Sequence, residues 1–166
     1  MAKTLLLVRH GKSAWNKPGL SDHERPLLKV GIERTIRVAH YLKAHTGCPD
    51  LIVSSHAVRA FETARLLAGE LGYPGHEIQI ESNIYFFGQD GLFDIATGLP
   101  DEKDAVMLVG HNPAMTQLAN VFLTDKLDYL PTTGVVSIGF DAERWSDIPL
   151  ASKRTNFLIT PKMLEL

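Results

Sequence analysis

Residues 4–11 read TLLLVRHG. The run from Thr4 to Val8 is almost wholly apolar, which is typical of a strand that is buried on both faces of a parallel sheet. Arg9 ends the run, and His10 and Gly11 follow at the expected carboxyl end of that strand. Ligands of open α/β sheets bind at the carboxyl ends of the strands. This stretch therefore predicts a central strand and, directly after it, a functional site.

Further strand patterns follow along the chain. Short apolar runs at 51–53 and 105–109 predict two more buried strands, and the polar–apolar alternation at 77–81 predicts a half-exposed one. Residues 135–140 and 156–159 are expected to form late strands.

Between these runs, apolar residues recur at helical spacing. The faces expected to be buried carry Ile32, Ile36, Ala39 and Leu42 in the first helix, Val58, Phe61, Ala64, Ala68 and Leu71 in the second, and Met115, Leu118, Ala119 and Phe122 in the third. A short helix is also expected near residues 92–97. The alternation of strands and helices predicts a single-domain, doubly wound α/β fold: a mostly parallel sheet with helices on both faces.

Small polar residues mark the ends of the predicted helices. Ser54 and Ser55 are suited to cap the start of the second helix, and Asn112 the start of the third. Gly72 is placed to end the second helix.

Length and composition limit the class of protein. A chain of 166 residues fits one domain, which we expect to span residues 1–166. The net charge of −2 gives no support for a nucleic-acid or membrane partner. The single cysteine, Cys48, excludes an internal disulfide, and no apolar stretch is long enough for a membrane span. A cytoplasmic location is expected.

Basic and imidazole side chains follow three of the predicted strands. Arg9 and His10 follow the first strand, Arg59 comes shortly after the second, and His111 follows the strand at 105–109. Arginine forks match phosphate oxygens, and a helix N-terminus beside His111 adds backbone N–H donors. The set is suited to bind a phosphoryl group.

The same residues carry a family resemblance. The segments at 9–11 (RHG), 55–64 (SHAVRAFETA) and 110–113 (GHNP), in this order, resemble the motifs of the histidine phosphatase superfamily, also called phosphoglycerate mutase-like. The segment DHERPL at 22–27, with Gly31 after it, resembles the short SixA-type branch of phosphohistidine phosphatases. The resemblance covers about residues 3–140.

The resemblance implies a phosphoglycerate mutase-like fold and a role for each matching residue. His10 would be the nucleophile and would form a phosphohistidine intermediate, while Arg9, Arg59 and His111 would hold the phosphoryl oxygens. Neutral imidazole is a competent nucleophile near pH 7. A hydrogen bond from its other ring nitrogen to a carbonyl would set the attacking tautomer. No metal or other cofactor is expected, because the arginines supply the positive charge. Ser13 and Asn16, in the loop after the nucleophile, are further candidates for substrate binding.

One position departs from the family pattern. Many members place a glutamate general acid after the third strand, and Asn83 falls near that position here. Glu81 is a candidate proton donor, with Asp90 and Tyr85 as alternatives. Imidazole leaves a phosphoramidate more readily than an alkoxide leaves an ester, so a weak or absent acid favours phosphohistidine as the substrate.

The sequence thus predicts a hydrolase of phosphoramidates or phosphoric monoesters. The expected partner is a phosphorylated protein, such as a histidine-phosphotransfer domain, because short loops leave the site open. Two alternatives remain: a phosphatase or mutase for a small phosphorylated metabolite, and a module that binds phosphate without turnover.

Overall fold

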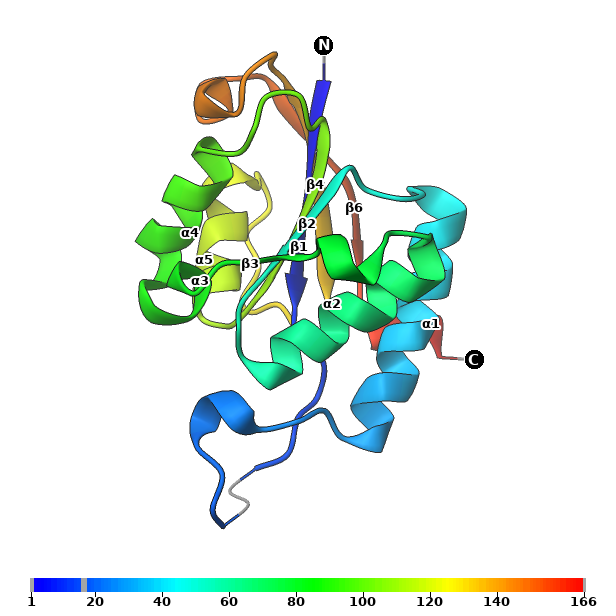
Figure 1. Ribbon diagram of the computed structural model, residues 1–166. Helices are drawn as coiled ribbons and strands as arrows, with labels where there is room; N and C mark the ends of the chain where they lie inside the picture. The colour runs from blue at the N-terminus through cyan, green and yellow to red at the C-terminus, as the bar shows by residue number, and fades with distance from the viewer. Residues whose placement is uncertain (1, 16–17, 166) are drawn as a thin grey trace.

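A six-stranded sheet forms the centre of the molecule (Figure 1). The structure is a computed structural model and describes residues 2–15 and 18–165. The strand order is β3-β2-β4-β1-β5-β6. The strands are β1 (Ala2–Arg9), β2 (Leu51–Ser54), β3 (Gln79–Ile80), β4 (Ala105–Gly110), β5 (Val135–Asp141) and β6 (Lys153–Ile159).

The sheet is mixed, with parallel pairing from β3 to β1 and antiparallel pairing beyond β1. β1 pairs in parallel with β4, β4 with β2, and β2 with β3. β5 lies antiparallel to β1, and β6 antiparallel to β5. The predicted α/β fold is confirmed, and the carboxyl ends of β1, β2 and β4 meet at one edge.

Helices cover both faces of this sheet, as predicted. α1 (Lys29–His45) and α2 (Val58–Leu71) lie on one face, and α3 (Asn83–Phe86), α4 (Gly88–Thr97) and α5 (Ala114–Phe122) on the other (Figure 1). Among the described residues, no helix is both long and apolar enough to cross a membrane.

Strand β1 contributes to two separate hydrophobic cores. Leu5 and Leu7 belong to the core under α4 and α5, whereas Leu6 and Val8 belong to the core under α1 and α2. Successive side chains of a strand point to opposite faces. The apolar run therefore becomes a strand buried on both sides, and it carries Arg9 and His10 to the sheet edge.

The predicted caps of α2 are wrong. Ser54 is the last residue of β2, and the residue before the helix is Ala57, with no side-chain cap. Ser55 instead accepts a hydrogen bond from the Ala57 N–H with its Oγ, at 3.1 Å. The chain turns between the end of β2 and the start of α2, and Ser55 lies in that turn. Gly72 ends α2 in the left-handed conformation, as predicted.

The predicted buried face of α1 is confirmed at Ala39 and Leu42 but is wrong in the first half of the helix. Ile32 and Ile36 are only half-buried, while Gly31, Thr35 and Val38 are buried. Tight contacts with two loops select small and polar residues here. A Cβ on Gly31 would lie 2.2 Å from the Lys12 carbonyl oxygen in the loop after β1. The Thr35 Oγ1 lies 3.1 Å from the Thr133 Oγ1 in the loop before β5.

Two other expectations were inaccurate in extent. The strand predicted at 77–81 is reduced to Gln79–Ile80, because residues Gly75–Glu77 form a 3₁₀ turn. The helix predicted at 92–97 begins earlier, at Gly88, and the short α3 before it was not predicted.

Candidate active site

A pocket of about 440 Å³ lies at the edge of the sheet where β1, β2 and β4 end. It brings together all four residues predicted to bind or attack the phosphoryl group. The lining residues are Arg9, His10, Lys12, Ser13, Trp15, Arg25, Arg34, Arg59, His111, Asn112 and Thr132. Trp15 is 77% exposed and stands at the rim, with the Arg25 guanidinium 5.2 Å from its ring centre.

His10 is held in one tautomer. Its Nδ1 lies 2.7 Å from the carbonyl oxygen of Gly11. Because a carbonyl oxygen only accepts hydrogen bonds, Nδ1 carries the proton in the neutral ring and Nε2 keeps a lone pair. The pKa of His10 is lowered to about 4, chiefly by burial and also by the nearby Arg59 and Arg9 charges, while the Gly11 hydrogen bond opposes the shift. The imidazole is therefore neutral, with Nε2 available, at physiological pH.

His111 lies next to His10 at the end of β4. The two ring centres are 5.2 Å apart, and the His111 Nε2 is 2.8 Å from the Ser55 Oγ. Burial lowers the pKa of His111 to about 3, with smaller contributions from His10 and Arg59. Both rings are thus neutral in the empty pocket. A bound phosphate dianion would favour the protonated form of either ring.

Arg9 brings an uncompensated positive charge. It is the last residue of β1, and its Nη1 donates to the carbonyl oxygen of Leu130 at 3.1 Å. Among the described residues, no carboxylate lies within 4 Å of its guanidinium. Burial lowers the pKa of Arg9 from its ordinary value. A half-buried guanidinium without a carboxylate partner favours the binding of an anion.

Arg59 is positioned by a carboxylate. It lies in the first turn of α2, is 5% exposed, and donates from Nη1 to the Asp22 carbonyl oxygen at 2.8 Å and from Nη2 to the Asp22 Oδ2 at 3.0 Å. Each Nη carries two hydrogens, so the guanidinium retains N–H donors for a ligand.

Asp22 is the centre of a network that sequence reasoning did not assign to the site. Its Oδ1 accepts from Arg25 Nη2 at 3.0 Å, and its Oδ2 accepts from the Tyr85 hydroxyl. The Tyr85 hydrogen bond, followed by those of Arg59 and Arg25, holds the pKa of Asp22 well below its usual range. The available signal was the DHERPL segment, which contains Asp22 and Arg25 three residues apart.

Helix α2 fixes the position of the backbone beside His10. Thr63 Oγ1 accepts from the Gly11 N–H at 2.9 Å and donates to the Arg59 carbonyl oxygen at 2.7 Å. One buried hydroxyl therefore joins the segment that carries His10 to the helical turn that carries Arg59.

Of the other predicted site residues that the structure describes, Ser13 lies at the pocket and Glu81 does not. Ser13 lines the pocket, and its Oγ accepts from Arg25 Nη1 at 3.2 Å. Asn16 lies outside the described residues. Glu81 does not line the pocket; its Oε1 accepts from the Asn83 N–H at 3.2 Å.

The two alternative acids also lie outside the pocket lining. Asp90 borders a different hollow, beside Asn83 and Phe87. Tyr85 packs edge-on against His111 with 5.3 Å between ring centres, but its hydroxyl hydrogen is directed to Asp22. Burial and the Asp22 carboxylate raise the pKa of Tyr85, which opposes proton donation.

The charge of the pocket is strongly positive. Five of its lining side chains are Arg or Lys, and none of the described ones is Asp or Glu. No cluster of His, Cys, Asp or Glu among residues 2–15 and 18–165 has the arrangement to hold a metal ion. The site has the chemistry to bind a tetrahedral oxyanion next to a neutral imidazole.

The comparison with protein families agrees with this geometry. The family described as histidine phosphatase superfamily (branch 1) matches residues 5–84, which include His10, Asp22 and Arg59. The chain belongs to the histidine phosphatase superfamily. A solved histidine phosphatase structure from Agrobacterium tumefaciens, provisionally described as the phosphohistidine phosphatase SixA, superposes with a TM-score of 0.81 at 25% identity. The superposition covers 96% of this chain and 98% of that one. The predicted phosphoglycerate mutase-like fold is thus confirmed.

Two curated relatives extend the comparison. A chloroplastic protein of Arabidopsis thaliana, described as uncharacterized, is 34% identical over 136 residues, or 73% of this histidine phosphatase chain. The match spans only 59% of the Arabidopsis protein. A Mycobacterium tuberculosis protein, also described as uncharacterized, is 26% identical over 153 residues, covering 85% of this chain and 91% of its own length.

Proposed function

We propose that this protein is a phosphatase that removes the phosphoryl group from a phosphohistidine of another protein, through a covalent intermediate on His10. The observation that carries the proposal is the hydrogen bond between the His10 Nδ1 and the Gly11 carbonyl oxygen. It leaves Nε2 as a neutral nucleophile in a pocket whose charged side chains are all cationic.

In the first step, the His10 Nε2 attacks phosphorus and forms a P–N bond while the P–N bond of the substrate breaks. The substrate imidazole leaves with the bonding electron pair and takes a proton from water. Arg9, Arg59 and His111 donate to the equatorial oxygens, whose charge must be compensated throughout the transfer. Arg59 can compensate this charge without rearrangement, because Asp22 already holds its guanidinium in place.

In the second step, a water molecule attacks the phosphoryl group on His10. The P–Nε2 bond breaks, inorganic phosphate leaves, and the water proton passes to phosphate or solvent. The Gly11 carbonyl oxygen keeps the Nδ1 proton in place, so His10 returns as the same neutral tautomer.

The lack of an acidic side chain in the described pocket lining supports this substrate class. An alkoxide leaving group needs a strong proton donor, whereas an imidazole leaving group does not. Glu81, Asp90 and Tyr85 do not line the pocket, and the Tyr85 hydroxyl donates its proton to Asp22. This argues against a phosphatase or mutase that acts on esters of small metabolites.

The first test is trapping of the phosphoenzyme. The protein is mixed briefly with a ³²P-labelled phosphohistidine protein, denatured in base, and examined for label. We expect a label that survives base and is lost in acid, as a phosphoramidate would be, and that is absent in His10→Ala. No label and no phosphate release from wild-type protein, either with this donor or with phosphate esters, would leave only the binding-module alternative.

The second test compares leaving groups. We expect kcat/KM for phosphoramidate or a phosphohistidine peptide to exceed that for p-nitrophenyl phosphate and alkyl phosphates. A clear preference for an alkyl phosphate would contradict the proposal and favour a metabolite phosphatase. In that case, substitution of Glu81, Asp90 and Tyr85 in turn would identify the donor.

A further inference from the structure

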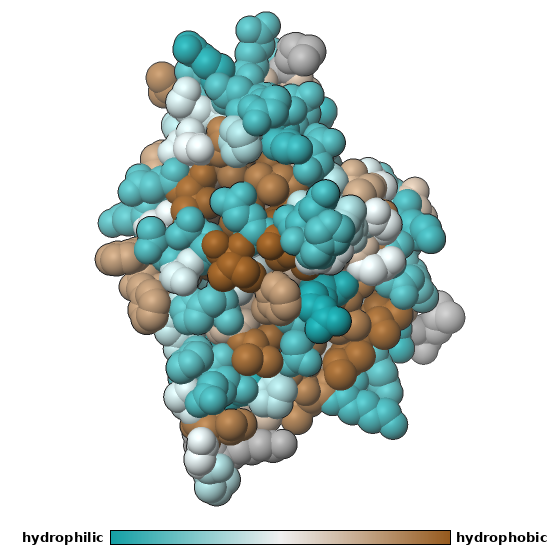
Figure 2. Space-filling model, in the orientation of Figure 1, coloured by the Kyte–Doolittle hydropathy of each residue, from teal (hydrophilic) through white to brown (hydrophobic). Residues whose placement is uncertain are grey.

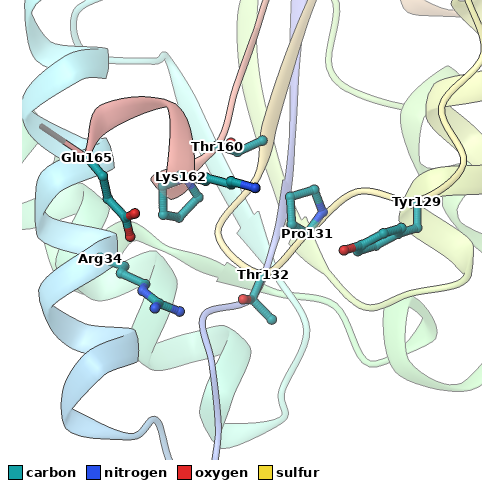
Figure 3. Close-up of a pocket in the computed structure, with 8 residues that line it drawn as sticks. Arg34, Tyr129, Pro131, Thr132, Thr160, Lys162 and Glu165 are labelled. Atoms are coloured by element: carbon teal, nitrogen blue, oxygen red, sulfur yellow. The ribbon is translucent and has the colours of Figure 1, made fainter.

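A second pocket of about 350 Å³ adjoins the candidate active site (Figure 3). Its walls come from three separate parts of the chain: α1, the loop before β5, and the C-terminal 3₁₀ turn at Pro161–Leu164 with the residue after it. The lining residues are Arg34, Tyr129, Pro131, Thr132, Thr160, Pro161, Lys162 and Glu165.

The two pockets share part of their walls. Arg34 and Thr132 line both of them. A phosphoryl group consists of only a few atoms, so it leaves much of the 440 Å³ first pocket free for the group that carries it. A ligand with its phosphoryl group beside His10 can therefore continue past Arg34 into the second pocket.

The second pocket is basic. Figure 3 shows the guanidinium of Arg34 and the ammonium of Lys162 directed toward the same space, with the Tyr129 hydroxyl facing them from the other side. Among the described residues, no ion pair within 4 Å involves Arg34, Lys162 or Glu165. Two cations and one carboxylate give the space an excess of positive charge, with both cations unpaired.

We propose that this pocket binds a second anionic group of the substrate, a carboxylate or phosphate, between Arg34 and Lys162 while the phosphoryl group occupies the first pocket. The proposal rests on the proposed function for the position of the phosphoryl group. In a phosphohistidine protein, the second group is an acidic side chain close to the phosphohistidine. Arg34 and Lys162 donate to its oxygens, and the hydroxyls of Tyr129 and Thr132 supply neutral donors.

The first experiment measures binding and does not depend on turnover. The probes are ω-phosphonocarboxylates of increasing chain length, each compared with the alkylphosphonate of the same length, with Kd obtained by calorimetry. For at least one length, we expect the acid to bind wild-type protein about two- to fivefold more tightly, which is the range of a partly exposed ion pair.

Substitutions then assign this preference to the pocket. Arg34→Gln and Lys162→Gln should each reduce the ratio of the two Kd values toward one. Arg37→Gln is the matched control, because Arg37 lies three residues further along α1, is exposed, and lines neither pocket; it should keep the wild-type ratio. Equal binding of acids and alkylphosphonates at every length, or loss of the ratio in Arg37→Gln alone, would overturn the proposal.

A second experiment identifies the source of the anionic group. Phosphohistidine peptides with glutamate or glutamine at positions flanking the phosphohistidine are compared by kcat/KM. If the second anionic group is a side chain of a protein substrate, wild-type protein should have a higher kcat/KM for the glutamate peptide than for the glutamine peptide. This preference should be smaller in Lys162→Gln. Hydrolysis of both peptides at equal rates would assign the pocket to a small bis-anionic substrate. Tighter binding of phosphonocarboxylates than of alkylphosphonates, without hydrolysis of either peptide, would support the anion-binding role of the second pocket and contradict the proposed function.

Discussion

The Asp22 carboxylate and the Arg59 guanidinium form an ion pair at 3.0 Å, and a second hydrogen bond joins Arg59 to the Asp22 backbone. Asp22 thereby places a nearly buried cation at the pocket without itself lining the pocket. Arg25 and Tyr85 complete its hydrogen bonds. The carboxylate acts as a positioning group for Arg59, the arginine that we propose binds the phosphoryl group.

Removal of this carboxylate should weaken phosphate binding more than it weakens the fold. We expect Asp22→Ala to lower kcat/KM about 10- to 100-fold, because Arg59 loses its preorganised position, and to raise the Kd for inorganic phosphate. Kinetics, calorimetry and thermal unfolding measure these effects. Asp125→Ala, which removes an exposed carboxylate elsewhere, is the control. An unchanged Kd for phosphate in Asp22→Ala would refute the positioning role.

Gly31 is expected to be intolerant of a side chain. A Cβ at this position would lie 2.2 Å from the Lys12 carbonyl oxygen, so α1 and the loop after the nucleophile would have to separate. Gly31→Ala should cost about 1–3 kcal/mol of unfolding free energy and lower kcat/KM. Gly69→Ala is the control, because a Cβ there meets nothing within 4 Å and helix α2 should gain up to about 1 kcal/mol. Equal stability of the two variants would contradict this reading of the α1 contact.

The Thr63 hydroxyl should matter for both stability and activity. Thr63→Val leaves the buried Gly11 N–H without its acceptor, which should cost about 1–3 kcal/mol. It should also lower kcat/KM about tenfold, since Gly11 adjoins His10. Thr63→Ser keeps the hydroxyl and should retain most of the activity. Urea unfolding and steady-state kinetics measure the two effects, and a Ser variant as impaired as the Val variant would point to packing instead.

The low pKa of His10 predicts an unusual pH profile. The neutral fraction of a histidine with an ordinary pKa near 6.5 would fall about 25-fold between pH 7 and 5. With a pKa of about 4, His10 stays neutral over that range, so, once the ionisation of the substrate is corrected for, kcat/KM should change little between pH 7 and 5. NMR titration of the free protein, with His10→Asn for assignment, measures the pKa directly. A measured His10 pKa near 6.5 would show that the pocket does not disfavour the protonated imidazole, which would contradict this prediction.

The same shift links stability to pH. The folded-state pKa of His10 lies below its unfolded value, so the unfolded chain binds more protons between about pH 6.5 and 4. Stability is therefore expected to fall as pH falls through this window, with up to about 1.4 kcal/mol per pH unit from this group. His111 acts in the same direction. Chemical denaturation at several pH values gives the slope of the unfolding free energy against pH. His10→Asn should reduce this slope between about pH 6.5 and 4. An unchanged slope would show that other groups cause the pH dependence of stability.

Local sequence pattern determined the elements that carry the site. The apolar runs that became β1, β2 and β4 are continuous, and a run buried on both faces has few alternatives to a central strand. Because parallel strands end at a common edge, Arg9, His10, Arg59 and His111 were placed together from sequence alone. Family motifs also led to the expectation of a hydrogen bond from His10 to a carbonyl, which the structure places at Gly11.

Tertiary structure alone decided the contacts between segments distant in sequence. The Asp22–Arg59 pair spans 37 residues, and the Tyr85–Asp22 contact spans 63. Apolar spacing predicted the burial of Ala39 and Leu42 in α1, whereas the burial of Gly31 follows from contact with the loop after β1. Periodicity reports only which face of one element is apolar, whereas these contacts depend on how separate elements pack. The exclusion of Glu81 and the proximity of Arg34 to Lys162 depend on the same packing.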